Sequence, residues 1–222
     1  MHAEQDMDLT AIFPGISEQQ LQKLRQFSSL VKTWNRRMNL VSRSDGDRLW
    51  EHHLLPSIIP LNFIDIAVES WILDIGSGGG FPAIPLKTMR PDLQIVMVDS
   101  IRKKTLFLKQ AIADLKLQNI TVMKERVEIL SQNPDFHKRF DVVTARAVDQ
   151  IDILIKWGRP FLKDVGYFLL WKGESDISEL EQSAALLNYR YTVHSVPEAL
   201  QEYSRKFKEL RWFRIDFTTD KT

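Results

Sequence analysis

The fold is decided by the stretch Leu73-Asp74-Ile75-Gly76-Ser77-Gly78-Gly79-Gly80-Phe81, in which an apolar strand runs into a cluster of glycines. Four of the nine glycines of the chain fall here within five positions. Glycine tolerates a positive φ and lets a bulky ligand lie against bare backbone. In an open parallel sheet, ligands bind beyond the carboxyl ends of the strands, where the strand order reverses. We therefore interpret the stretch as a ligand-binding loop that follows the first strand of a sheet.

Outward from this loop, short apolar segments alternate with helical patterns from Trp71 onward. The expected strands are 71–75, 94–99, 120–124, 141–145, 167–171, 191–196 and 212–217. The expected helices are 83–88, 103–115, 151–157 and 178–187. Such alternation forms βαβ units, and right-handed crossovers place the helices on both faces of a parallel sheet. We expect a doubly wound α/β fold whose seven-stranded sheet is mixed but mostly parallel.

The segment before Trp71 carries helical patterns and no strand pattern. Ser17 is a suitable N-cap for a helix that reaches residue 40. Apolar residues recur there at helical spacing, namely Leu21, Leu24, Phe27, Leu30, Val31 and Trp34. A second helical stretch is expected over residues 45–59. We therefore assign residues 1–70 to an N-terminal helical cap and residues 71–222 to a cofactor-binding α/β core, both within a single domain, 1–222.

The composition is that of a soluble globular protein, with 27% charged and 44% hydrophobic residues. The chain has no cysteine, which excludes disulfides, thiolate metal sites and cysteine nucleophiles. Residues 1–6 lack the basic start and the apolar run of a signal peptide. The most apolar stretch, 57–75, is interrupted by proline, asparagine and acidic residues, which are costly in a membrane span. We expect a cytoplasmic monomer with no membrane span and no metal.

The net charge of +1 argues against attraction of nucleic acid to the whole surface. Three local clusters of basic residues remain as candidates for such contacts. They are Lys32, Arg36, Arg37 and Arg43; Arg102, Lys103, Lys104 and Lys109; and Arg205, Lys206, Lys208, Arg211 and Arg214. Each cluster is either part of an RNA surface or a solvated face.

The kind of ligand is indicated by Asp99, which ends the second strand about twenty residues after the glycines. A carboxylate there is placed to accept both hydroxyls of a ribose, so the pattern favours a cofactor that contains adenosine. A nicotinamide enzyme would show Gly-x-Gly-x-x-Gly and hold a pyrophosphate at the helix N-terminus. This chain reads Asp-x-Gly-x-Gly-x-Gly and then Phe81-Pro82. That pattern fits S-adenosylmethionine, which has no phosphates; the alternative is a purely structural turn.

Two later positions extend the expected site. Arg126-Val127-Glu128 follows the third strand, where a backbone amide and a carboxylate are placed to read the adenine edge. The alternative for Glu128 is an acid favoured by the helix macrodipole. Arg146 follows the fourth strand and is expected over the cleft, although an arginine there also pairs with acids. Lys172, which ends the fifth strand, either meets a phosphate or is solvated.

With these residues, the chain closely resembles the GidB/RsmG family, methyltransferases that make 7-methylguanosine in small-subunit ribosomal RNA. The resemblance keeps its order over almost the whole chain. It rests on Trp34-Asn35, Asn39-Leu40, His53, residues 74–85, Pro91, Asp99-Ser100, Lys103-Lys104, Arg126-Val127-Glu128, Ala145-Arg146-Ala147 and Lys172-Gly173. It implies the class I methyltransferase type of the doubly wound fold.

The resemblance also implies which residues line the cofactor pocket. Together with the acids and glycines above, the expected cofactor-binding residues are Asp74, Gly76, Gly78, Phe81, Asp99, Val127, Glu128 and Arg146. Arg146 is also the candidate catalytic residue. One departure stands out, because the family usually has His-x-x-Asp-Ser where this chain has His53-Leu54-Leu55-Pro56-Ser57. Pro56 supplies no carboxylate and is expected to bend the helix, while His53 is expected to be a packed or capping residue.

The chemistry fits a guanine N7 acceptor. N7 has an in-plane lone pair and no proton, so its methylation needs no general base. Methylation of pyrimidine C5 uses a cysteine nucleophile, and the Asn/Asp-Pro-Pro-Tyr/Phe motif of exocyclic-amine enzymes is missing after the fourth strand. An arginine that gripped guanine through O6 and N7 would block the reacting atom, so we expect Arg146 to contact the cofactor, O6 or a phosphate.

The expected activity is therefore S-adenosylmethionine-dependent methylation of N7 of a guanosine in 16S rRNA, with naked rRNA or a small ribosomal subunit particle as the partner. An unstacked base in an RNA loop is what such an enzyme can read and reach. Phe81 is either a stacking surface for that base or part of the core. Two alternatives stay open: a methyltransferase of another substrate, and a catalytically silent RNA-binding or assembly protein.

Overall fold

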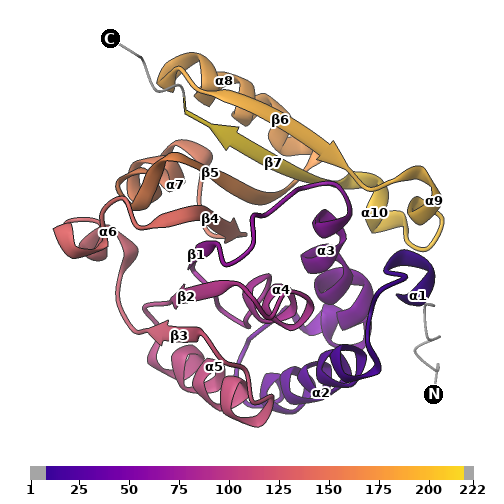
Figure 1. Ribbon diagram of the computed structural model, residues 1–222. Helices are drawn as coiled ribbons and strands as arrows, with labels where there is room; N and C mark the ends of the chain where they lie inside the picture. Colours follow the sequence, from indigo (N-terminus) through magenta and orange to yellow (C-terminus); the bar gives the residue numbers. More distant parts are fainter. Residues whose placement is uncertain (1–8, 218–222) are drawn as a thin grey trace.

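A seven-stranded sheet forms the centre of the molecule in the computed structural model, which describes residues 9–217 (Figure 1). The strand order is β3-β2-β1-β4-β5-β7-β6. The strands are β1 (Trp71–Ile75), β2 (Gln94–Val98), β3 (Ile120–Met123), β4 (Phe140–Arg146), β5 (Leu162–Gly173), β6 (Arg190–Ser195) and β7 (Leu210–Asp216). The first five are parallel, and β7 runs antiparallel to both β5 and β6. The predicted mixed, mostly parallel sheet is confirmed.

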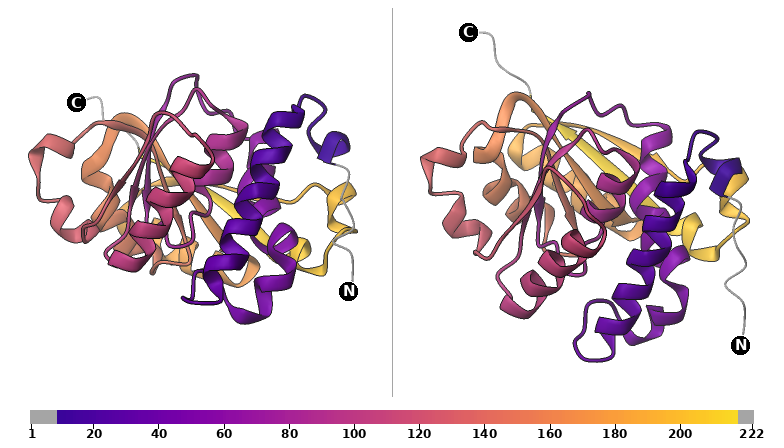
Figure 2. Two further views of the ribbon diagram at one scale, coloured as in Figure 1. Left: turned by 90° about the horizontal axis from the view of Figure 1, so that it is seen from below. Right: turned by 60° about the horizontal axis from the view of Figure 1, so that its bottom comes forward.

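Helices cover both faces of the sheet (Figures 1 and 2). One face packs against α2 (Glu18–Asn35), α3 (Leu55–Ile58), α4 (Ala83–Met89) and α5 (Arg102–Asp114). The other packs against α6 (Val127–Leu130), α7 (Ile151–Gly158) and α8 (Ile177–Leu187). Strand side chains alternate between these two cores, so Ile72 of β1 joins the first and Leu73 joins the second. The doubly wound arrangement follows from this alternation.

The helix predicted from Ser17 is present as α2, and it begins with a capping box. Ser17 Oγ accepts from the Gln20 amide at 3.2 Å, and Gln20 Oε1 accepts from the Ser17 amide at 2.9 Å. The helix ends at Asn35 instead of residue 40. The Asn35 side chain causes the early end, because its Oδ1 accepts from the Leu40 and Val41 amides at 2.8 and 3.1 Å and turns the chain back.

The second helical stretch of the cap is present but is not one helix. It passes from a 3-10 turn, Arg43–Arg48, through a π turn, Trp50–Leu54, into α3 and then a second 3-10 turn, Ile59–Asn62. Pro56 is the second residue of α3 and has no N–H to donate to the preceding turn. The expected disturbance at Pro56 therefore takes the form of a change of helix type.

Besides α6, three short helices are missing from the expected helices: α1 (Leu9–Ile12), α9 (Glu198–Gln201) and α10 (Arg205–Glu209). Elements of four or five residues are too short to show a helical period. In Figure 1, α1, α9 and α10 lie together at the side of the molecule next to α3. Strand ends also moved by a few residues, most at β5, which begins at Leu162 instead of 167.

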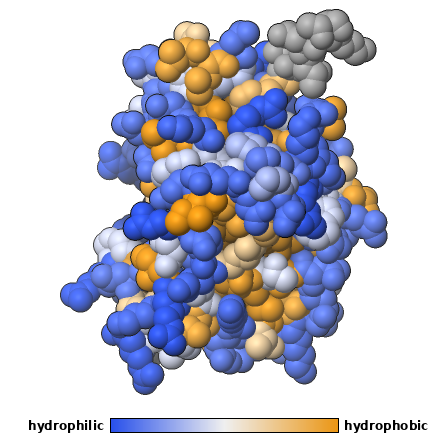
Figure 3. Space-filling model, turned by 90° about the vertical axis from the view of Figure 1, so that its left-hand side faces the viewer, coloured by the Kyte–Doolittle hydropathy of each residue, from blue (hydrophilic) through white to orange (hydrophobic). Residues whose placement is uncertain are grey.

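None of the helices in residues 9–217 is both long and apolar enough to cross a membrane. The face seen in Figure 3 is mostly hydrophilic, with hydrophobic residues gathered in patches between the polar ones. Residues 1–6, on which the expectation about a signal peptide rests, lie outside the described residues.

Candidate active site

The glycine loop lies where the strand order of the sheet reverses, between β1 and its neighbours β2 and β4. It connects β1 to α4. The amides of Gly76 and Ser77 both donate to the Val98 carbonyl, at 2.9 and 3.1 Å. These bonds fix the loop to the carboxyl end of β2, which is the edge at which doubly wound folds bind ligands.

The glycines of the loop differ in why a side chain is absent. Gly76 and Gly80 have φ of +67° and +86°, and β-carbons there would lie 2.6 Å from Val148 and 2.8 Å from Ile84. Gly78 also has a positive φ, +51°, but a β-carbon there would meet no atom closer than 3.6 Å. Packing therefore requires Gly76 and Gly80, whereas a β-carbon at Gly78 would make only ordinary van der Waals contacts at the ligand edge of the sheet.

Asp99 joins the glycine loop to the start of α5. Its carboxylate is nearly buried, 6% exposed. One oxygen accepts from the Gly78 amide at 2.9 Å, and the other accepts from the Ile101 amide at 2.8 Å. A carboxylate oxygen has two lone pairs, so each oxygen retains capacity for a ribose hydroxyl.

Asp74 carries an unsatisfied oxygen at the same edge. The residue is 1% exposed, and its Oδ1 accepts from Thr144 Oγ1 at 2.7 Å, whereas Oδ2 is buried without a partner. Burial raises the pKa of Asp74 to about 6, although the hydrogen bond from Thr144 opposes the rise. An unpaired buried oxygen costs free energy, so Oδ2 calls for a donor from a ligand.

These groups fit S-adenosylmethionine. The cofactor carries an ammonium group, which suits Asp74 Oδ2, and ribose hydroxyls, which suit the Asp99 carboxylate. Gly78 has no side chain at this edge, so a ligand can lie against the loop backbone. In residues 9–217 no group of three or more histidine, aspartate or glutamate side chains is arranged to hold a metal ion.

Arg146 ends β4 at the active edge, as expected, but its side chain points to the helical cap. Nη2 donates to the His52 carbonyl at 2.5 Å and Nη1 to the His53 carbonyl at 3.3 Å. In an α-helix the amide of residue 56 would donate to the His52 carbonyl, and Pro56 cannot. Burial lowers the pKa of Arg146 to about 10, with the charge of Asp45 opposing the shift. The guanidinium therefore fastens the cap to the edge of the sheet.

Phe81 belongs to the core between loop and cap. It is 7% exposed, and its ring centre lies 5.2 Å from that of Phe27 and 5.1 Å from that of His53. Phe81 was expected to be either a stacking surface for a base or part of the core, and the structure shows it packed in the core.

Val127 and Glu128 lie in the first turn of α6, at the same edge as Asp99. The Asp99 amide donates to the Met123 carbonyl, the last residue of β3, so the two segments are neighbours. Val127 is buried, and the Glu128 side chain is 38% exposed and pairs with Arg126 at 3.3 Å. The structure brings both residues to the ligand edge, in the segment that follows β3.

Lys172 is already paired. Its Nζ lies 3.1 Å from Glu179 Oε2, and its side chain is 13% exposed. Lys172 is therefore neither a solvated lysine nor a free ligand for a phosphate, which were the two alternatives from the sequence.

Asp45 is a site residue that the sequence did not reveal. Its Oδ1 lies 2.8 Å from His52 Nδ1, and its Oδ2 lies 3.1 Å from His53 Nε2. Burial acts to raise the pKa of Asp45, but hydrogen bonds with His52, Ser42 and His53 outweigh it and hold the pKa below its usual range. Burial lowers the pKa of His53 to about 3, assisted by the charge of Arg146. The result is a neutral His53 held by an ionised Asp45.

The C-terminal segment completes this polar cluster. Ser204 Oγ donates to Glu51 Oε1, and the charges of Asp45 and Lys206 influence each other. These contacts join positions more than 150 residues apart, at a sequence separation of 153 for Ser204 and Glu51. No local pattern in the sequence signals such a pairing.

The fold and the site together define a class I S-adenosylmethionine-dependent methyltransferase. A solved S-adenosylmethionine-dependent methyltransferase from Aquifex aeolicus matches the fold with a TM-score of 0.61 at 12% identity, covering 80% of this chain and 100% of that one. The assignment to this class rests on the strand order, the glycine loop at the switch point, and the acids at the ends of β1 and β2.

Sequence comparisons then give the family. The model of the family described as "rRNA small subunit methyltransferase G" matches residues 20–207. A ribosomal RNA small subunit methyltransferase G from Neisseria gonorrhoeae is 39% identical over 181 residues, covering 80% of this chain and 84% of the relative. One from Roseiflexus castenholzii is 36% identical, covering 72% and 68%. The chain belongs to the rRNA small subunit methyltransferase G family.

Proposed function

We propose that this protein transfers the methyl group of S-adenosylmethionine to N7 of a guanosine in 16S rRNA. The observation that carries the choice of N7 is that, apart from the buried Asp74, the carboxylates and histidines described at the site are already hydrogen-bonded within the protein. Asp99 is bound to two backbone amides, and Asp45 is bonded to a ring nitrogen of both His52 and His53. Such groups suit an acceptor that has no proton to lose.

Each site residue has a role in this proposal. Bound S-adenosylmethionine supplies an electrophilic methyl group on a sulfonium. Asp74 accepts from its ammonium, and Asp99 holds its ribose while fixing the glycine loop. Val127 and Glu128 border the adenine. Positioning provides much of the acceleration, because the nucleophile must align with the methyl carbon and the sulfur.

Arg146 is the candidate for a contact with the substrate. Two of its five N–H donors are used by the carbonyls of the cap, so others remain to meet guanine O6 or a phosphate. We propose that it orients the base without covering N7. Because this contact depends on the docked cap, residues 1–70 and 71–222 act as one catalytic domain.

The proposal includes a cytoplasmic, monomeric protein that acts on rRNA or on the small subunit particle. Membership of a family of rRNA methyltransferases supports the rRNA substrate. N7 methylation leaves a fixed positive charge on guanine, so borohydride reduction followed by aniline cleaves the RNA at that nucleotide.

The test is a comparison of 16S rRNA from cells with the gene, cells without it and cells complemented by it. Cleavage at one guanosine is expected in the first and third and not in the second. A methyl group that is found on a carbon or on an exocyclic amine would overturn the N7 assignment. Unchanged rRNA in all three strains would favour another substrate or a silent binding protein.

A further inference from the structure

The structure distinguishes the three basic clusters, and one of them lines a groove. At the end of α2, a groove of about 490 Å³ is bordered by Lys32, Arg36, Arg37 and Arg43, with Asp47 as its acidic member. A neighbouring hollow of about 430 Å³ is formed by residues 39–43. The two share Asn39 and Arg43 and therefore lie next to each other, and together they are called here the cap groove.

Three of the basic side chains of the cap groove are the arginines Arg36, Arg37 and Arg43. Arg36, Arg37 and Arg43 are exposed. No acidic side chain in the part of the chain that the structure describes forms an ion pair with any of these three arginines. Their guanidinium groups are therefore available to an external anion.

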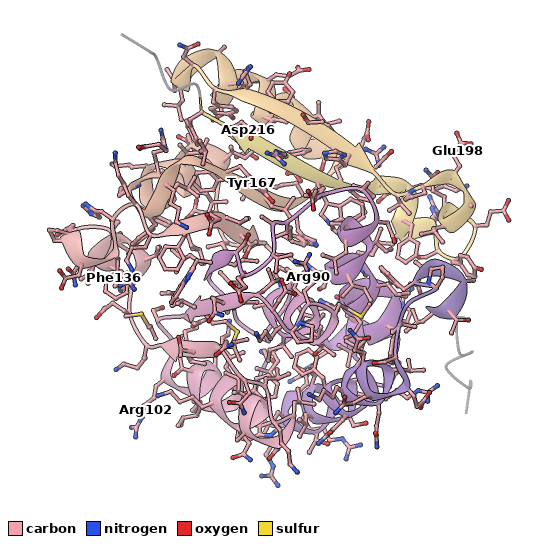
Figure 4. The ribbon with its side chains drawn as sticks, in the orientation of Figure 1. Arg90, Arg102, Phe136, Tyr167, Glu198 and Asp216 are labelled. Carbon is pink, nitrogen blue, oxygen red and sulfur yellow. The ribbon has the colours of Figure 1, made fainter. Side chains whose placement is uncertain are left out.

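The C-terminal basic cluster is different, because two of its arginines, Arg211 and Arg214, are paired with acids of the chain. Arg211 pairs with Glu174, and Arg214 lies 2.9 Å from Asp216. On α5, Arg102 extends away from the body of the molecule (Figure 4), while Lys104 Nζ turns back toward the loop, 3.9 Å from where a β-carbon of Gly78 would lie. Among the three basic clusters in residues 9–217, the cap groove thus combines a hollow with three arginines, Arg36, Arg37 and Arg43, that form no ion pair.

The cap groove also touches the cofactor loop. Asn35 Oδ1 holds the amides of Leu40 and Val41, which fixes the wall of the groove. On the other side of that wall, the Leu40 carbonyl lies 3.1 Å from where a β-carbon of Gly79 would be. Leu40 therefore both lines the cap groove and lies against the glycine loop. In both views of Figure 2, the segment after α2 projects at the lower edge of the molecule, open to a large partner.

We propose that the cap groove binds the phosphodiester backbone of the substrate RNA and thereby presents the target base at the glycine loop. The planar forks of Arg36, Arg37 and Arg43 match phosphate oxygens. Phosphate contacts position the strand and carry no base specificity, so the groove supplies register while the active edge selects the guanine. This inference rests on the proposed function, since it assumes an RNA substrate.

The test uses the double variant Arg37→Ala/Arg43→Ala and the control Lys156→Ala/Arg190→Ala. The control removes the same charge from two exposed residues, at the end of α7 and at the start of β6, opposite Asp216 of β7. The probe is 16S rRNA from cells that lack the gene. Its Kd is measured against salt concentration, together with KM and kcat for methyl transfer. Titration with S-adenosylmethionine and thermal melting check that each variant folds.

For the groove variant, the slope of log Kd against log salt is expected to flatten by about 0.7 for each phosphate contact on single-stranded RNA that is lost. KM for RNA should rise about tenfold or more while kcat, cofactor affinity and melting remain near wild type. The control should match wild type throughout. A groove variant that matched the control would overturn this inference and leave the proposed function standing. A wild-type protein that methylated no RNA would overturn the proposed function itself.

Discussion

Thr144 Oγ1 donates a 2.7 Å hydrogen bond to Asp74 Oδ1, from β4 to β1, in the completely buried region beneath the glycine loop. The bond uses one oxygen of the carboxylate and orients the group, while the second oxygen has no partner in the protein. A side chain in this state costs stability in the free enzyme and gains a partner only when the ligand binds. Function and stability therefore oppose each other at Asp74.

Asp74→Asn should stabilise the free protein and abolish cofactor binding. The pKa of Asp74 is about 6 in the folded protein against 3.8 in the unfolded chain. Between these values the folded state binds a proton that the unfolded state does not, so the wild-type cost is greatest above pH 6 and disappears as the pH falls to 3.8. Removing this cost should raise the free energy of unfolding by about 1–3 kcal/mol at pH 8 and by less near pH 4. Melting at the two pH values and calorimetric titration with S-adenosylmethionine check both effects, and an unchanged cofactor affinity would contradict the role of Asp74.

Gly78→Val should abolish cofactor binding with little change in the core. The valine side chain would cover the bare backbone against which the ligand is proposed to lie, and a φ of +51° is unfavourable for a branched residue. Gly15→Val is the matched control, because nothing lies within 4 Å of its β-carbon and its φ is not positive. Isothermal titration should show binding to the control and none to Gly78→Val. Normal binding to both would show that the ligand lies elsewhere.

Arg146→Ala should lower the methylation rate of the folded protein on the order of a hundredfold, because positioning at the active edge is lost. The variant should also be less stable by about 1–3 kcal/mol, since two carbonyls of the cap lose their donor. Arg146→Lys keeps the positive charge but not the planar set of N–H donors of the guanidinium. Rates are compared per folded molecule, with circular dichroism as the check on folding. If only stability changes, Arg146 is structural.

His53→Gln should retain most of the methylation activity, and its free energy of unfolding should depend less on pH than that of the wild type. The pKa of His53 is about 3 in the folded protein and 6.5 in the unfolded chain. The unfolded state therefore binds an extra proton between pH 6.5 and 3, and wild-type stability falls as the pH falls through that window, by at most about 1.4 kcal/mol per pH unit. Denaturant unfolding at several pH values measures this slope. A methylation rate that collapsed in the variant, or an inflection near neutral pH assigned to His53, would support a histidine base and contradict the N7 mechanism.

The sheet and the cofactor loop were predictable because their signals are local. Strand length, the glycines after Asp74 and the spacing to Asp99 are all properties of short segments, and the structure places those residues at one edge. The expected set of cofactor contacts remains a prediction, but its members gather at that edge, apart from the Phe81 ring, which is packed into the core.

The contacts around Arg146 were not predictable, because they join distant segments. The pattern at the end of β4 gave the position of the arginine but not the direction of its side chain, which depends on where the turn of His52 and His53 docks. Asp45 belongs to no sequence pattern that would identify it as a site residue. The lost carboxylate at Pro56 was visible in the sequence, but the missing N–H that leaves the His52 carbonyl to Arg146 became evident only in three dimensions.

The carbonyl of Pro56 accepts hydrogen bonds from two indoles, Trp171 Nε1 of β5 at 2.6 Å and Trp212 Nε1 of β7 at 3.3 Å. One backbone oxygen of the cap thus ties together two strands from the last third of the chain. Release of the cap would leave both indoles as unpaired donors in the interior, so cap, β5 and β7 should open as one cooperative unit and exchange their amide hydrogens together. Two of the six tryptophans of the chain stand at this junction, which makes their intrinsic fluorescence a natural reporter of cap undocking.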